Sequence, residues 1–150
     1  MTRLRLLTLV ALGMAISAVL IPCEAKSKRI QVTAQVAQQT FLGDPVSPQL
    51  GDRRITSVDL FDERGTKVGT GGASCMIVSV PPLDTLEECL LTAVLAEGQI
   101  MFGGMAPLAV VGASAQFGIL GGTDEFRKSR GDVMLVVTAP DSIDVTFNLD

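Results

Sequence analysis

Few side chains of this chain could do chemistry, because it holds three cysteines, no histidine, no tyrosine and no tryptophan. Without histidine, neither a Ser-His-Asp nor a Cys-His nucleophile can be assembled, and no metal site with imidazole ligands can form. Three cysteines are also too few for a metal site built from sulfur alone. We therefore expect no metal and no other cofactor.

Cys75 and Cys89 are the cysteines that could react with each other. They flank a turn signal at Pro81-Pro82, and an antiparallel hairpin that pivots on Pro82 places Cys75 opposite Cys89. Opposed Cα atoms lie roughly 4.5 to 5.5 Å apart, within reach of a disulfide. We predict that the two cysteines form a disulfide, which stabilises the fold by about 3 kcal/mol in the loop-entropy estimate. A reactive thiol is the alternative.

Two uncharged polar side chains are candidates for a direct role in binding. Gln38 shares the parity of Val32 and Val36, so we expect it to point inward and to orient a ligand by donating a hydrogen bond. Thr56 shares the parity of Val58 and is expected on the same inner face. No residue is assigned a catalytic step.

These candidates lie on segments in which apolar and polar residues alternate, as is typical of β-strands. Turn signals such as Glu63-Arg64-Gly65 and Ala139-Pro140-Asp141 separate them. The segment 106–115 is ambiguous between helix and strand. The predicted strands are 30–39, 54–62, 67–80, 86–96, 99–105, 113–120, 131–138 and 143–149. Short strands joined by tight turns indicate an antiparallel barrel or sandwich.

Hairpin pivots at Arg64-Gly65, Pro82 and Glu97-Gly98 sort the side chains of residues 54–105 into two faces. On the outer face, the apolar residues Leu90, Val94 and Met101 lie among polar residues. This pattern is typical of a subunit contact, so we expect a homo-oligomer. Small inner residues and the 4% aromatic content favour a ligand cavity over a filled core, the alternative. The expected pocket is Gln38, Thr56, Val58, Leu60, Leu91, Ala93 and Phe102.

The N-terminal segment 1–25 reads as a signal peptide. Arg3 and Arg5 precede an apolar run of 16 residues at 6–21, shorter than the roughly 20 residues of a spanning helix. We expect cleavage after Ala25, release of one domain at 26–150, secretion, and no stable membrane span. The alternative is a lipoprotein acylated at Cys23, which Pro22 fits badly. The net charge of −4 excludes the basic surface that nucleic acids require.

The mature chain resembles the allene oxide cyclase barrel-like superfamily, which includes the plant dirigent proteins. The segment 119–133 (ILGGTDEFRKSRGDV) is similar to their Gly-Gly-Thr-Gly-x-Phe-x-x-Ala-Arg-Gly signature. Three further segments carry the resemblance: Leu50-Gly51-Asp52 followed by Val58-Asp59-Leu60-Phe61-Asp62; the segment 67–75, which ends in Cys75; and Glu97-Gly98-Gln99-Ile100.

The resemblance implies a small closed antiparallel barrel of about eight strands. It also implies an apolar cavity that folds a hydrophobic, reactive metabolite so that one stereoselective cyclisation or coupling prevails. Allene oxide cyclisation itself is disfavoured, because Val58 stands where that enzyme has an asparagine and the segment 31–39 has no carboxylate. The alternative is a carrier that binds an apolar small molecule without chemistry.

Overall fold

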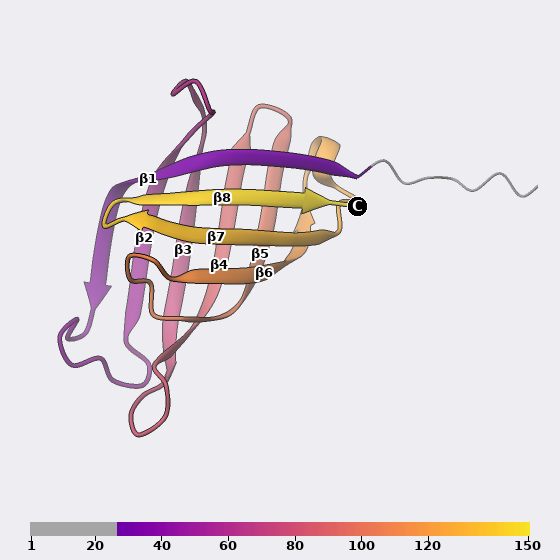
Figure 1. Ribbon diagram of the computed structural model, residues 1–150. Helices are drawn as coiled ribbons and strands as arrows, with labels where there is room; N and C mark the ends of the chain where they lie inside the picture. Colours follow the sequence, from indigo (N-terminus) through magenta and orange to yellow (C-terminus); the bar gives the residue numbers. More distant parts are fainter. Residues whose placement is uncertain (1–26) are drawn as a thin grey trace, which may run out of the picture.

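In a computed structural model that describes residues 27–150, the chain forms one closed barrel of eight antiparallel strands (Figure 1). Each strand pairs with the next, and β8 pairs with β1 to close the sheet. The strands are β1 Lys28–Leu42, β2 Arg53–Phe61, β3 Lys67–Ser79, β4 Leu86–Leu95, β5 Gly98–Pro107, β6 Ser114–Gly122, β7 Gly131–Ala139 and β8 Ser142–Leu149. The predicted all-β barrel is therefore confirmed.

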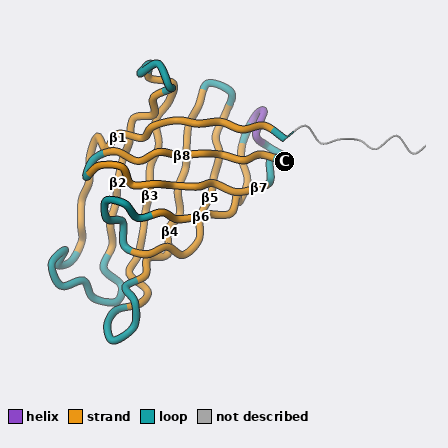
Figure 2. Tube along the Cα trace, in the orientation of Figure 1, coloured by secondary structure: helices purple, strands orange, loops and turns teal. Residues whose placement is uncertain are grey.

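Strands dominate the described chain, as Figure 2 shows. A single turn of 3₁₀ helix, η1 Asp124–Phe126, lies between β6 and β7. The ambiguous segment 106–115 divides between the end of β5, a loop at 108–113 and the start of β6. Within residues 27–150, no helix is long and apolar enough to cross a membrane. The predicted signal peptide and Cys23 lie outside the described residues.

The hairpin registers follow the turns. Leu60 pairs with Gly69 between β2 and β3, and Cys75 pairs with Cys89 between β3 and β4, as their pivots predict. The register of β4 and β5 differs from the prediction by two residues, since Leu91 pairs with Phe102 rather than with residue 104. The reason is that only Ala96 and Glu97 separate these strands. A shift of two leaves every side chain on its predicted face.

Strand β1 contains a bulge that overturns one prediction. Val36 pairs with Val58 on β2, but the next pair along the ladder is Gln38 with Ser57, which leaves Ala37 as the extra residue. An extra residue inverts the alternation of side chains beyond it. The prediction that Gln38 points into the barrel is therefore wrong, and Gln38 is exposed.

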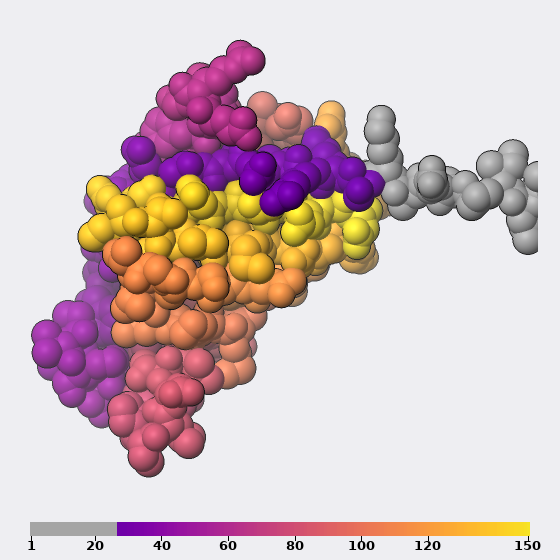
Figure 3. Space-filling model, viewed as in Figure 1, coloured from indigo at the N-terminus to yellow at the C-terminus, as the bar shows by residue number. Residues whose placement is uncertain are grey.

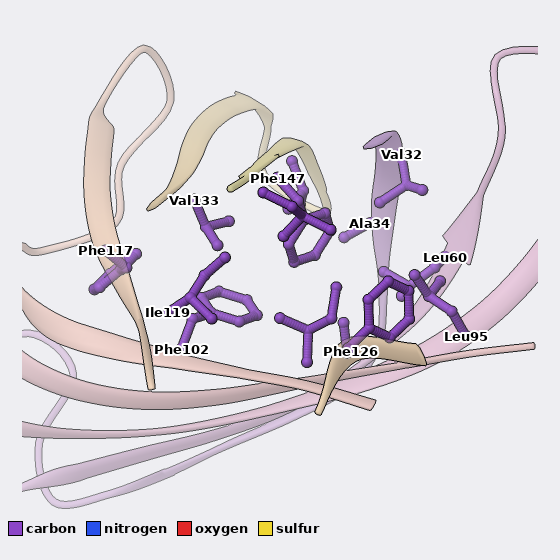
Figure 4. Close-up of a cluster of buried hydrophobic side chains, with 14 of the residues drawn as sticks. Val32, Ala34, Leu60, Leu95, Phe102, Phe117, Ile119, Phe126, Val133 and Phe147 are labelled. Atoms are coloured by element: carbon purple, nitrogen blue, oxygen red, sulfur yellow. The ribbon is translucent and has the colours of Figure 1, made fainter. Parts of the chain in front are cut away.

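Buried apolar side chains form one cluster inside the barrel (Figure 4), and the part of this cluster nearest η1 fills that end. Phe126 from η1 covers this end and is 2% exposed. Gly122 lets η1 approach closely, since a Cβ atom at that position would lie 2.7 Å from the carbonyl oxygen of Phe126. The packed half is defined by the cluster residues that do not line the cavity described below: Val32, Leu95, Ile100, Ile119, Phe126, Val133 and Leu149.

The opposite end carries three loops. Loop 43–52 follows β1, loop 80–85 joins β3 to β4, and loop 108–113 joins β5 to β6. Figure 3 shows that loops 43–52 and 80–85 protrude from the same side of the molecule. The strand residues next to these loops, such as Arg54, Glu87 and Pro107, line the cavity described below.

Candidate functional site

A cavity of about 110 Å³ occupies the half of the barrel opposite η1. This hollow half receives side chains from all eight strands and extends to the loop 108–113. Its lining is mostly apolar: Ala34, Val58, Leu60, Gly71, Gly72, Ala73, Cys75, Cys89, Leu91, Ala93, Phe102, Ala106, Pro107, Ala109, Ala113, Ala115, Phe117, Leu135, Val137, Ile143, Val145 and Phe147, with Arg54, Thr56, Glu87, Thr92 and Ser114.

The cavity exists because small residues occupy many inward positions. Ala73, Ala93 and Ala106 lie on three neighbouring strands, where a longer side chain would occupy the space. Inward positions of an eight-stranded barrel either fill the interior or leave room for one small ligand. Here the hollow half leaves room.

Three phenylalanines separate the cavity from the packed half. The rings of Phe102 and Phe147 meet edge to face with centroids 5.5 Å apart, and those of Phe102 and Phe117 with centroids 6.3 Å apart. All three rings line the cavity and also belong to the buried core cluster (Figure 4). Edge-to-face contacts are a favoured arrangement of aromatic rings, and the three rings together give the cavity an apolar floor.

A buried ion pair lies in the wall of the cavity. Arg54 binds the carboxylate of Glu87 through two nitrogens, with Nε 3.1 Å from Oε1 and Nη2 in contact with Oε2. The Glu87 side chain is 1% exposed and that of Arg54 is 17% exposed. This two-point geometry is the strong form of an arginine-carboxylate contact, and it makes the pair neutral as a unit.

The predicted disulfide is present beside this ion pair. Cys75 and Cys89 are bonded, with Cα atoms 4.1 Å apart, and Arg54 Nη2 lies 3.9 Å from the sulfur of Cys75. Ligand atoms of Cys75, Glu87 and Cys89 lie within 4.8 Å of one another. The sulfurs are bonded to each other and Arg54 holds the carboxylate, so this cluster offers no free thiolate to a metal.

Thr56 is the second polar feature of the wall. It is 7% exposed, and its hydroxyl oxygen has no hydrogen-bond partner among residues 27–150. Its neighbours across the ladder are Gln39 on β1 and the small Ala73 on β3. An unsatisfied buried hydroxyl in a cavity wall is a group that a bound molecule can satisfy.

The structure brings six of the seven predicted pocket residues together around the cavity: Thr56, Val58, Leu60, Leu91, Ala93 and Phe102. Gln38 is outside because of the bulge in β1. Arg54 and Glu87 are wall residues that the motifs do not single out. The alternation of side chains along the strands could have placed them on the inner face. Arg54 precedes the inward-facing Thr56 by two residues, and Glu87 precedes the inward-facing Cys89 by two.

Other proteins share this fold. The model of the allene oxide cyclase barrel-like domain matches residues 29–146. Pyocyanin demethylase is 25% identical, with a TM-score of 0.73 and coverage of 82% of this chain and 100% of that protein. No curated protein matches the sequence.

Two Diels-Alderases have similar structures. The exo-specific intermolecular Diels-Alderase AbnU is 17% identical, with a TM-score of 0.71 over 82% of this chain and 97% of that protein. The Diels-Alderase AbmU from Streptomyces koyangensis is 16% identical, with a TM-score of 0.67 over 85% of this chain and 71% of that protein. Since the family model spans almost all of the barrel, this chain belongs to the allene oxide cyclase barrel-like family.

Proposed function

We propose that this chain binds an apolar, intrinsically reactive small molecule in the hollow half and directs its ring closure without a cofactor. The observation that carries the proposal is the cavity itself, with its small aliphatic wall and its floor of three phenylalanines. A rigid apolar chamber can hold the reacting atoms of one folded substrate near bonding distance. It also keeps water away from a reactive intermediate.

Cycloaddition is the ring closure that fits the side chains best. It forms two carbon-carbon bonds from electrons the substrate already holds, so no proton must be transferred and no group leaves. A chain without histidine can accelerate such a reaction by shape alone. The likeness to two Diels-Alderases supports this choice of reaction class.

The test compares product stereochemistry in the presence and absence of the protein. Linear polyenes, each with a diene and an activated alkene, are incubated with wild type, with Ala93→Phe, and with Ala96→Phe as the control. Ala93 is 3% exposed in the wall, whereas Ala96 lies in the exposed β4–β5 turn. Chiral chromatography resolves the products.

Wild type and Ala96→Phe should enrich one stereoisomer and raise the rate, because their cavities are intact. Ala93→Phe should return the ratio found in buffer while remaining folded. A wild-type ratio equal to that in buffer would contradict the proposal. Saturable binding with that same ratio would instead identify the alternative, a carrier.

We also propose that residues 1–25 are removed and that the mature protein acts outside the cytoplasm. The Cys75–Cys89 disulfide supports this location, because disulfides persist in oxidising compartments. N-terminal sequencing of protein recovered outside the cytoplasm should begin at Lys26. Retention in the cytoplasm with Met1 intact would contradict it, and an acylated Cys23 would identify a lipoprotein.

A homo-oligomer is the third part of the proposal. Leu90 and Leu120 are 50% and 60% exposed on the outer face and flank Gly103 in one shallow groove. Exposed apolar side chains that gather in this way are typical of subunit contacts. Sedimentation equilibrium should give a multiple of the monomer mass for wild type and the monomer mass for Leu90→Glu.

A further inference from the structure

We infer that the cavity selects an uncharged molecule with a carbonyl-type hydrogen-bond acceptor, and that the Thr56 hydroxyl is its donor. This inference rests on the ligand site of the proposed function, but not on the reaction. It follows from two features of the wall, an unsatisfied hydroxyl and a neutralised ion pair.

The hydroxyl of Thr56 is the first feature. Its oxygen is buried and unpartnered within the described residues, although the side chain lines the cavity. Ala73, directly opposite on β3, leaves space in front of it, and directly opposed Cβ atoms lie only about 4.5 to 5.5 Å apart. A ligand that fills the space over Ala73 is therefore within reach of the hydroxyl. Leaving a buried hydroxyl without a partner costs free energy, so a ligand that supplies one is favoured.

The donors of the wall decide which kind of polar group fits. Arg54 lies two residues before Thr56 on the same face, and its contacts with Glu87 engage Nε and Nη2, not Nη1. The Glu87 carboxylate already accepts from both nitrogens. The Thr56 hydroxyl can donate or accept, whereas Arg54 Nη1–H can only donate. A ligand acceptor can therefore bind either group, and a ligand donor could bind Thr56 alone, so an acceptor matches the wall better.

The ion pair decides the charge of the ligand. Glu87 is 1% exposed and neutralises Arg54, so the wall has no net charge to offer. A ligand carboxylate would leave water for an apolar cavity without a counter-charge, which is costly. It would also compete with Glu87 for the guanidinium. The site therefore favours a ketone, ester or amide oxygen over an acid.

Three probes of nearly equal shape test this inference on the folded protein: acetophenone, α-methylstyrene and benzoate. Each probe is a benzene ring with one substituent. The substituent is an acetyl group, C(=O)CH₃, in acetophenone, an isopropenyl group, C(=CH₂)CH₃, in α-methylstyrene, and a carboxylate in benzoate. Dissociation constants are measured by NMR titration at millimolar ligand, with Thr56→Val as the test variant. Thr70→Val is the matched control, because Thr70 is exposed on the outer face.

The measured quantity is the Kd of α-methylstyrene divided by the Kd of acetophenone. Thr56→Val should lower this ratio by about three- to ten-fold, the net effect of one hydrogen bond. The difference in hydration free energy between the two probes does not affect the comparison of wild type with variant, because the same probes bind both proteins. Thr70→Val and Thr56→Ser should keep the wild-type ratio. If Thr56→Val does not fold, Thr56→Ala replaces it and is compared with Thr56→Ser.

Glu87→Gln tests the charge selection. Wild type should bind benzoate more weakly than acetophenone, whereas Glu87→Gln should bind benzoate about ten-fold more tightly than wild type, because Arg54 is no longer neutralised. An unchanged probe ratio in the variant that lacks the Thr56 hydroxyl, or wild-type binding of benzoate as tight as that of acetophenone, would overturn the inference alone. Failure of all three probes to bind wild type would overturn both the inference and the proposed function.

Discussion

The packed half and the hollow half of the barrel share the same strands and the same backbone ladders, yet they differ in side-chain size. In the packed half, Ile100 and Val133 are fully buried and Phe126 closes the end. In the hollow half, alanines at 73, 93 and 106 leave a cavity of about 110 Å³. A few wall positions therefore decide whether an eight-stranded barrel is a solid core or a chamber.

The two halves differ in polarity as well. Thr56 and Glu87 are the polar side chains buried in the described chain, and both line the hollow half. Glu87 is paired with Arg54, whereas the Thr56 hydroxyl has no partner among residues 27–150. A buried polar group without a partner destabilises a fold, so the presence of Thr56 there is better explained by ligand binding than by folding. Changes in the packed half should therefore act mainly on stability, and changes in the hollow half mainly on binding.

Phe126→Ala should have the largest effect on the free energy of unfolding. The ring is 2% exposed and covers the packed end, so its removal leaves a void and should cost about 4 kcal/mol. Denaturant unfolding measures this loss. Leu83→Ala, at a loop side chain that is 72% exposed, is the control and should change stability by less than about 0.5 kcal/mol. Equal losses in the two variants would show that the packed half is not densely packed.

Replacing both Cys75 and Cys89 by alanine should have the next largest effect. The disulfide joins residues 14 apart in sequence, and its removal should cost about 3 kcal/mol through the entropy of the unfolded chain. Because the bond also lies in the cavity wall, its removal should weaken probe binding as well. A variant as stable as wild type would contradict the presence of the bond in the native protein.

Most of the barrel could be predicted from its turns. Once Pro82 is a pivot, Cys75 must face Cys89, and the alternation then places Ala93 and Phe102 inside. The β4–β5 turn is centred one residue earlier than its Glu97-Gly98 signal suggests, but a register shift of two preserves the faces. The order and type of the strands are therefore a local property of the sequence.

Two features of the site could not be predicted in the same way. Nothing in the alternation of segment 30–39 reveals the bulge after Val36, because bulges depend on how the neighbouring strand bends. The hollow half also depends on contacts that only barrel closure creates, such as Phe102 against Phe147. Arg54 and Glu87 have inward parity, but charged side chains at the ends of strands are usually solvated.

Arg54→Met should reveal how the ion pair is balanced. The substitution leaves the Glu87 carboxylate buried without its partner, and we expect a loss of about 2 kcal/mol, below the range for a dry pair because Arg54 is 17% exposed. The double variant Arg54→Met with Glu87→Met should lose less than this single variant. A double variant that is less stable than the single one would show that the pair stabilises the barrel itself.

Enlarging one buried side chain in each half should give the smallest effect and the sharpest contrast. Ala93→Leu adds atoms where there is space and should cost less than about 1 kcal/mol, whereas Val133→Phe adds them to a packed core and should cost about 2 kcal/mol. Thermal unfolding of both variants measures the difference. Equal costs would indicate that the two halves are equally filled.

The most direct test of the central claim is a crystal structure of the protein under xenon pressure. Xenon enters apolar cavities that are large enough to hold it and does not enter packed cores. We expect xenon density between Ala73, Ala93 and Phe102, and none between Ile100, Phe126 and Val133. Xenon absent from the hollow half, or present beneath Phe126, would contradict the division of this barrel into a chamber and a core.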